Sequence, residues 1–192
     1  IKLGLAPTEI RVPFVIYPVG PLTLNVGGGA RFHALLDATL IPEIGVQFTV
    51  KHMGTRRAVE TVSDWYVLLE MADVAEGVAD TLLESALESE IVLDGVLAQS
   101  ETQRRDLWAL RENMSESQKF EGGSIKHDVA VPVSHLPAFI AEASAAVEAF
   151  QPGVRICCFG HMGDGNMHFN VSQPIGMDRQ SYLDRWHDMN RV

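Results

Sequence analysis

Residues 163–166, Gly-Asp-Gly-Asn, form a strong turn signal between two apolar segments, residues 154–162 and 167–172. Asp-Gly is a favoured centre for a two-residue turn between antiparallel strands. With Asp-Gly at that centre, the two segments are predicted to form a β-hairpin in which His161 lies directly opposite His168. The fold should therefore contain an antiparallel sheet, with two imidazoles on the same face of it.

The rest of the chain alternates between helix and strand patterns. Strands are predicted at residues 64–71, 90–98 and 125–132, and helices at 30–40, 73–88, 100–118, 134–149 and from 178 onward. Ser100 with Gln103 indicates a capping box at the start of one helix. The order β-α-β-α-β-α-β-β-α indicates an α+β fold of ferredoxin-like kind. In such a fold, helices pack on one face of a mainly antiparallel sheet.

The charge balance excludes some classes of function. The chain has 192 residues, a hydrophobic fraction of 46% and a formal net charge of −10. No apolar run approaches the roughly 18 residues of a membrane-spanning helix. A strongly acidic chain is a poor nucleic-acid binder, because such binders displace counterions with a basic surface. An anionic ligand would need a local basic cluster that works against the overall field.

Cys157 and Cys158 are the two cysteines, and they are adjacent. Neighbouring strand residues point to opposite faces, so we expect both to be reduced core residues in a reducing compartment. The chain begins with Ile1 and shows no signal-peptide pattern, so we expect it to be a piece of a longer protein. We divide it into a poorly readable lead-in, residues 1–45, and a domain at 46–192.

The two histidines of the hairpin are candidate metal ligands. Opposed side chains have Cβ atoms about 5 Å apart, and two imidazoles at that separation can share one ion. Asn170 follows His168 by two residues on the strand, so both side chains point to the same face. Two nitrogens are too few for a catalytic metal, which usually has about three protein ligands. The alternative is that the histidines are surface or hydrogen-bonded residues without a ligand role, and the pattern alone leaves both interpretations open.

A second candidate site is basic and polar. Arg111 lies late in a predicted helix, and Ser115 follows four residues later on the same helical face. Lys126 points off a strand face opposite the apolar one, whereas His127 faces the apolar side and is predicted to be a packed core histidine. An arginine fork, a hydroxyl and an ammonium can bind a carboxylate. The alternative is that both cations are solvated surface charges.

With these motifs in hand, the chain resembles the C-terminal domain of the FAD-linked 2-hydroxy acid dehydrogenase and oxidase family. That family includes D-lactate dehydrogenase, the glycolate oxidase flavin subunit and D-2-hydroxyglutarate dehydrogenase. The resemblance covers residues 46–192. Three stretches carry it: LWALRENMSES at 107–117, IKHDVAVPVSHLP at 125–137 and GHMGDGNMHFNV at 160–171.

The resemblance implies roles for matching residues. It makes His161 and His168 two ligands of a divalent metal, expected to be zinc, with Asn170 beside the metal and the substrate. It makes the basic and polar cluster, Arg111, Ser115 and Lys126, the binding site for the substrate carboxylate. The third ligand and the base belong to a later Glu-His-Gly motif that these residues lack. No catalytic residue is therefore expected within the chain, and we expect the domain to be truncated at its C-terminal end.

The resemblance implies a flavin-dependent oxidation of a D-2-hydroxy acid to the 2-oxo acid. FAD would be bound mainly by a domain outside the chain, and the fragment alone would be inactive. The expected partners are a small 2-hydroxy acid and an unknown electron acceptor, with a homodimer left open. The expected location is the cytoplasm, with the mitochondrial matrix or peripheral membrane association also open. The alternatives are a metal-independent ligand-binding or assembly domain, and a metal-dependent hydrolase.

Overall fold

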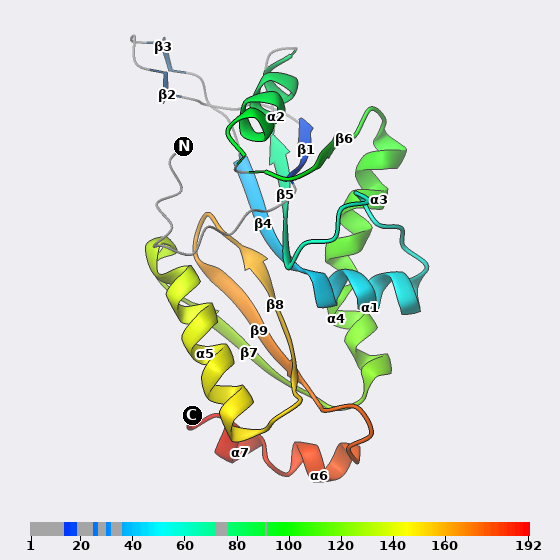
Figure 1. The fold of residues 1–192 in the computed structure, drawn as a ribbon, viewed down its shortest axis with the longest axis vertical. Coiled ribbons are helices and arrows are strands. Elements are labelled where there is room, and N and C mark those ends of the chain that lie inside the picture. The colour runs from blue at the N-terminus through cyan, green and yellow to red at the C-terminus, as the bar shows by residue number, and fades with distance from the viewer. Residues whose placement is uncertain (1–13, 19–24, 27–29, 32–35, 72–76, 91) are drawn as a thin grey trace.

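The computed structural model describes residues 14–18, 25–26, 30–31, 36–71, 77–90 and 92–192 (Figure 1). Its strands are β1 (Phe14–Pro18), β2 (Asn25–Val26), β3 (Ala30–Arg31), β4 (Leu36–Pro42), β5 (Trp65–Met71), β6 (Gly95–Leu97), β7 (Ser124–Ala130), β8 (Arg155–His161) and β9 (Asn166–Ser172). Its α-helices are α1 (Glu43–Met53), α2 (Val78–Glu88), α3 (Glu101–Glu112), α4 (Met114–Ser117), α5 (Leu136–Phe150), α6 (Arg179–Leu183) and α7 (Trp186–Met189). Short 3₁₀ turns follow α4 at Gln118–Glu121 and precede α5 at Val133–His135.

Seven strands form one sheet in the order β6-β1-β5-β4-β8-β9-β7. The five strands from β5 to β7 pair antiparallel throughout, and β1 pairs in parallel with β5 and β6. Figure 1 shows the β8–β9 hairpin beside β7, with β4 and β5 continuing the sheet. The predicted α+β class and mainly antiparallel sheet are confirmed.

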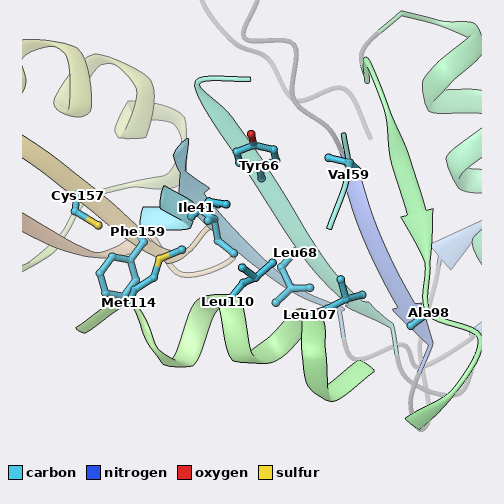
Figure 2. Close-up of a cluster of buried hydrophobic side chains, with 11 residues drawn as sticks. Ile41, Val59, Tyr66, Leu68, Ala98, Leu107, Leu110, Met114, Cys157 and Phe159 are labelled. Carbon is cyan, nitrogen blue, oxygen red and sulfur yellow. The ribbon is translucent and has the colours of Figure 1, made fainter. Parts of the chain in front are cut away.

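Helices cover both faces of the sheet, so the predicted placement on one face is wrong. Cys157 packs in a cluster with residues of α1, α3 and α4, among them Leu107, Leu110 and Met114 (Figure 2). Cys158, the next residue on the strand, packs in a second cluster with residues of α5, α6 and α7. The physical reason is strand alternation: Cys157 and Phe159 are buried on one face of β8 and Cys158 is buried on the other, so both faces must be covered.

The two cysteines behave as the sequence predicts. Both are free and fully buried, and they point into different clusters on opposite sides of the sheet. Burial raises the pKa of both thiols, to about 12 for Cys158. Thiols that remain protonated at neutral pH are poor nucleophiles and poor metal ligands, so these residues contribute packing.

The helix predicted at residues 30–40 is wrong where the structure describes that segment. Leu36–Pro42 is strand β4, which lies between β5 and β8 near the middle of the sheet, and residues 32–35 lie outside the described ranges. Helix α1 begins directly after it, at Glu43. Pro42 ends the strand in an extended conformation (φ −81°, ψ 152°) and occupies the N-cap position of α1. Thr39 and Ile41 in β4 are β-branched residues that favour a buried strand over a helix.

Most other elements match their predictions with shifted ends. The predicted cap of α3 is present, because Ser100 Oγ accepts a hydrogen bond from the Gln103 amide at 3.2 Å. The helix predicted to reach residue 118 is interrupted at Asn113, between α3 and α4. The strand predicted at 90–98 is confined to β6. Residues 73–76 of the predicted helix at 73–88 lie outside the described ranges.

The register of the hairpin differs from the prediction by two residues. His161 pairs with Asn166 and His168 pairs with Phe159, so the connection has four residues, 162–165. A two-residue turn would need the Asn166 amide to donate to the Gly163 carbonyl, but that amide donates to Oδ1 of Asp164 at 2.9 Å. A shift of two residues keeps every side chain on its face, so the histidines still share one side of the sheet.

One buried acid links the ends of three elements. Glu121 accepts hydrogen bonds from Lys51 and His52 at the end of α1 and from Arg155 on β8. Burial alone would raise the pKa of Glu121, but the bonds from His52, Lys51 and Arg155 outweigh it and lower that pKa from 4.5 to about 2. The stability that this lowered pKa contributes is therefore complete above pH 4.5 and is lost as the pH falls toward 2.

We expect Glu121→Gln to lower the free energy of unfolding at pH 7 by about 1–3 kcal/mol, because charged hydrogen bonds are lost. The difference from wild type should shrink as the pH falls from 4.5 toward 2, where the wild-type carboxylate also becomes protonated. Chemical denaturation across that range measures it. Glu84→Gln, on the exposed side of α2, is the control and should change little. If the free energies of unfolding of wild type and Glu121→Gln differ by the same amount at every pH, the lowered pKa of Glu121 is contradicted.

Candidate functional site

One face of the sheet carries a row of polar side chains across four neighbouring strands. From β4 to β7, one residue of each strand contributes to it: Asp37, His161, His168 and Asp128. Lys126 and Asn170, which pair across β7 and β9, point to the same side. We call these six residues the site face. It adjoins the apolar cluster under α3 and α4, because Cys157 and Phe159 belong to the same face of β8.

His161 is held at the β4 end of the row. Its Nδ1 atom is 2.9 Å from Oδ1 of Asp37, which lies 124 residues earlier in the chain. Both side chains keep 41% of their surface exposed, so the pair lies at the rim of the sheet and remains open to a ligand. Sheet pairing between β4 and β8 produces this contact, with Thr39 as the direct neighbour of His161.

His168 is held from two sides. It lies directly opposite Asp128 of β7, and its Nδ1 atom is hydrogen-bonded to Oδ1 of that residue. Its ring centroid lies 5.0 Å from that of Phe159, which is fully buried. The guanidinium carbon of Arg111 lies 5.3 Å from the same phenyl centroid. Phe159 therefore brings an arginine of α3 and a histidine of β9 to one place.

The predicted carboxylate-binding residues converge on the same side. Lys126 projects from β7 toward α4, where its Nζ atom lies 3.5 Å from the carbonyl oxygen of Ser115. Arg111 occupies the last turn of α3, just before the break at Asn113. Within the described ranges, neither Arg111 nor Lys126 has a carboxylate partner in an ion pair. Two cations without a counter-charge in an acidic protein are suited to bind an anion.

Two buried polar side chains lie at the edge of this arrangement. Asn170 is 2% exposed and is flanked by Lys126 on β7 and Cys157 on β8. Thr39 is fully buried, and its hydroxyl has no hydrogen-bond partner in the part of the chain that the structure describes. Buried hydroxyls are usually paired, so this one is available to a group placed beside His161.

The histidines fit part of a metal site. With each Nδ1 atom bonded to a carboxylate, the Nε2 atoms are the ones that could coordinate an ion, as in carboxylate-histidine-metal arrangements. Within the described ranges, however, no three His, Cys, Asp or Glu side chains come together closely enough to hold an ion. His161 and His168 are diagonal neighbours across β8 and β9, where Cβ atoms lie about 7 Å apart and not about 5 Å, and a shared ion would need its further donors from elsewhere.

Sequence patterns predict some residues of this site and miss others. The hairpin pattern points to His161 and His168, and the alternation of β7 places Lys126 and Asp128 on one face. Asp37 and Thr39 are missed, because no local motif marks residues that reach the site through the pairing of distant strands. His127, predicted to be a packed core histidine, is half-buried, and its ring nitrogens lie 3.0 Å from the Phe169 carbonyl oxygen and 2.6 Å from Oδ1 of Asn190.

Comparison with protein families settles the classification. Residues 33–192 match the family model described as FAD linked oxidases, C-terminal domain. The chain belongs to this family. The match includes β4 and all later elements, so every residue of the site face lies within the FAD-linked oxidase domain.

Relatives of the FAD-linked oxidase domain carry two different names. It is 36% identical over 182 residues to a putative mitochondrial D-lactate dehydrogenase of Schizosaccharomyces pombe, covering 86% of this chain and 35% of that protein. It is 38% identical over 135 residues to D-2-hydroxyglutarate dehydrogenase of Stutzerimonas stutzeri, covering 69% of this chain and 29% of that protein. It is 36% identical over 187 residues to D-2-hydroxyglutarate dehydrogenase of Xanthomonas citri pv. viticola, covering 95% of this chain and 39% of that protein. It is 35% identical over 126 residues to the mitochondrial D-2-hydroxyglutarate dehydrogenase of Bos taurus, covering 63% of this chain and 22% of that protein.

The chain thus spans between about a fifth and two fifths of the length of these relatives. None of the helices in the described ranges has the length and apolar character needed to cross a bilayer.

Proposed function

We propose that this domain is the substrate-binding part of a flavin-dependent dehydrogenase that oxidises a D-2-hydroxy acid to the 2-oxo acid. The observation that carries the proposal is the convergence of two cations without a counter-charge, Arg111 and Lys126, beside the paired histidines of the site face. The segments that supply these residues are far apart in the sequence, and the fold brings them to one side of the sheet. Family membership supports the flavin-linked chemistry.

In this proposal the cations bind and orient the substrate. Arg111 donates a fork of N–H groups to a carboxylate, and its stacking on Phe159 limits the orientations it can adopt. Lys126, held near Ser115, supplies a second positive charge, and the hydroxyl of Ser115 supplies a further donor. Asn170 is buried next to Lys126 and can donate to the 2-hydroxyl or carboxylate oxygen. Fixing the acid in one pose lowers the entropic part of the barrier.

The cofactors are assigned to the same reaction. FAD, bound mainly by another domain, supplies the hydride acceptor. A divalent metal, with zinc as the first candidate, would be held in part by Nε2 of His161 and Nε2 of His168 and would supply a Lewis acid next to the substrate. With both imidazoles assigned to the metal, neither is assigned as the base. This leaves the residues of the chain with binding and positioning roles.

D-2-hydroxyglutarate is the acid that we propose first. Three of the relatives reported above carry that name, and a dicarboxylate matches two cations that come from different elements, Arg111 of α3 and Lys126 of β7. D-lactate and glycolate have one carboxylate each and would leave one of the two cations without a partner. The electron acceptor is a separate protein or small molecule. We place the enzyme in the cytoplasm or, because the name of the Bos taurus relative includes the word mitochondrial, in the mitochondrion.

A second candidate is a metal-independent ligand-binding or assembly domain. The observation that favours it is that each histidine of the site face already has a carboxylate partner, Asp37 or Asp128, without any metal. In that case the cations would still bind an anion, but no oxidation would follow.

Steady-state oxidation distinguishes these proposals. The full-length flavin-loaded protein is assayed with an artificial dye acceptor and three acids: D-2-hydroxyglutarate, D-lactate and glycolate. We expect kcat/KM for D-2-hydroxyglutarate to exceed the other two by at least about 10-fold, which is the effect of roughly one charge-assisted bond. A preference for D-lactate would overturn the dicarboxylate assignment. Failure to oxidise all three would support the binding or assembly domain.

A further inference from the structure

We propose that Asp37 and Asp128 are positioning residues, each of which fixes one histidine of the site face in the tautomer that presents Nε2 to a metal ion. The inference rests on the proposed metal site and adds two residues to it. Neither aspartate is a ligand in this proposal, since each acts through the imidazole to which it is bonded.

The row across the sheet has an arrangement that argues for this role. The two histidines occupy the inner strands β8 and β9, and the two aspartates occupy the outer strands β4 and β7. Each aspartate bonds to Nδ1 of the nearer histidine. Both imidazoles therefore receive a carboxylate on the same ring atom, from opposite sides of the hairpin.

The protonation pattern follows from the chemistry of the donors. An ionised carboxylate can only accept hydrogen bonds, so Nδ1 of each histidine must carry the hydrogen. A neutral imidazole has one N–H, so its lone pair is then on Nε2. A carboxylate bonded to the far nitrogen also makes a metal-bound imidazole a stronger ligand.

The neighbouring residues also fix the positions of the two imidazole rings. His168 lies between Asp128, its direct neighbour across β7 and β9, and the phenyl ring of Phe159 at 5.0 Å. Phe159 is fully buried, so that wall cannot move without disturbing the core. The bond from His161 to Asp37 ties the last residue of β8 to β4 across 124 residues of sequence. Both partners come from regular strands, which hold geometry better than loops.

The test uses full-length protein freed of metal and then titrated with Zn²⁺ in competition with a chelator at constant pH. The variants are Asp128→Ala, Asp128→Asn and Asp37→Ala, with Asp188→Ala on α7 as a matched change of charge far from the row. We expect each alanine variant of the row to lose about 10- to 100-fold in Zn²⁺ affinity. Asp128→Asn keeps an acceptor oxygen and should recover part of the loss, and Asp188→Ala should match wild type.

A second readout needs no metal. Imidazole ¹³C and ¹⁵N shifts in metal-free protein, assigned with His168→Gln, report which nitrogen carries the hydrogen. We expect the Nδ1–H form for His168 in wild type and its loss in Asp128→Ala. The Nε2–H form of His168 in wild type would overturn the inference.

The two claims fail in different ways. If His168→Ala abolishes Zn²⁺ binding while both row alanine variants bind like wild type, the metal site stands and the positioning role is wrong. If wild type and His168→Ala show the same negligible affinity, the metal site itself is wrong, and the positioning role fails with it.

Discussion

Replacing Arg111 with alanine is expected to raise the apparent KM for D-2-hydroxyglutarate by about 10- to 100-fold with a smaller effect on kcat. A hydrogen bond between charged groups contributes about 1.5–3 kcal/mol, and about 1.4 kcal/mol corresponds to one factor of ten. The bond to a carboxylate that does not react is present in the ground state and the transition state alike. Its loss therefore appears mainly in KM.

Two companion variants separate charge, geometry and folding. Arg111→Lys keeps the charge but loses the fork, so its KM should fall between those of wild type and Arg111→Ala. Arg105→Ala removes an exposed arginine from the same helix, whose Nε atom donates to the Glu101 carbonyl, and should leave KM unchanged. Thermal unfolding of all three checks that the loss of packing on Phe159 is not the cause. Equal KM values in wild type and Arg111→Ala would show that Arg111 is a solvated surface charge that does not bind the substrate.

The second large effect concerns the turn that positions the histidines. Gly165 has φ of +72°, and a Cβ atom there would lie 1.9 Å from the carbonyl oxygen of Val131. Its own carbonyl accepts the amide of Val131 at 3.1 Å, so the backbone cannot easily withdraw. The left-handed conformation costs an L-residue about 1–2 kcal/mol, and overpacking costs about 1–3 kcal/mol. We expect Gly165→Ala to lower the free energy of unfolding by about 2–4 kcal/mol.

Gly163 provides a control within the same turn. A Cβ atom there meets nothing within 4 Å, and its φ is outside the left-handed region. Gly163→Ala should therefore change stability by less than about 0.5 kcal/mol, as exposed substitutions usually do. Denaturant unfolding of the two variants beside wild type measures the difference. Equal stabilities for Gly163→Ala and Gly165→Ala would show that the turn does not have the conformation described here.

Local patterns predict much of this structure because their causes are local. Strand alternation places Lys126 on the face opposite Ile125 and Val129, and it separates Cys157 from Cys158, as the structure confirms. Such alternation depends only on backbone geometry.

Features that depend on contacts between residues far apart in the chain are not predicted by local sequence patterns. The turn of the hairpin bonds to the chain after β7, where the Val131 amide donates to the Gly165 carbonyl, and the two-residue turn preferred by Asp-Gly is not formed. Asp37 reaches His161 only because β4 inserts between β5 and β8, which no motif in residues 30–40 indicates. The placement of helices on both faces likewise depends on how the whole sheet is covered.

The central claim is that this site face presents a D-2-hydroxy acid to a flavin. The most direct test mixes the full-length flavin-loaded protein with D-2-hydroxyglutarate in the absence of oxygen and records the oxidised-flavin absorption band. The account predicts that the band disappears at a rate that saturates with acid concentration, and that L-2-hydroxyglutarate leaves it unchanged. A band that persists with the D-acid, yet disappears on addition of dithionite, would contradict the account.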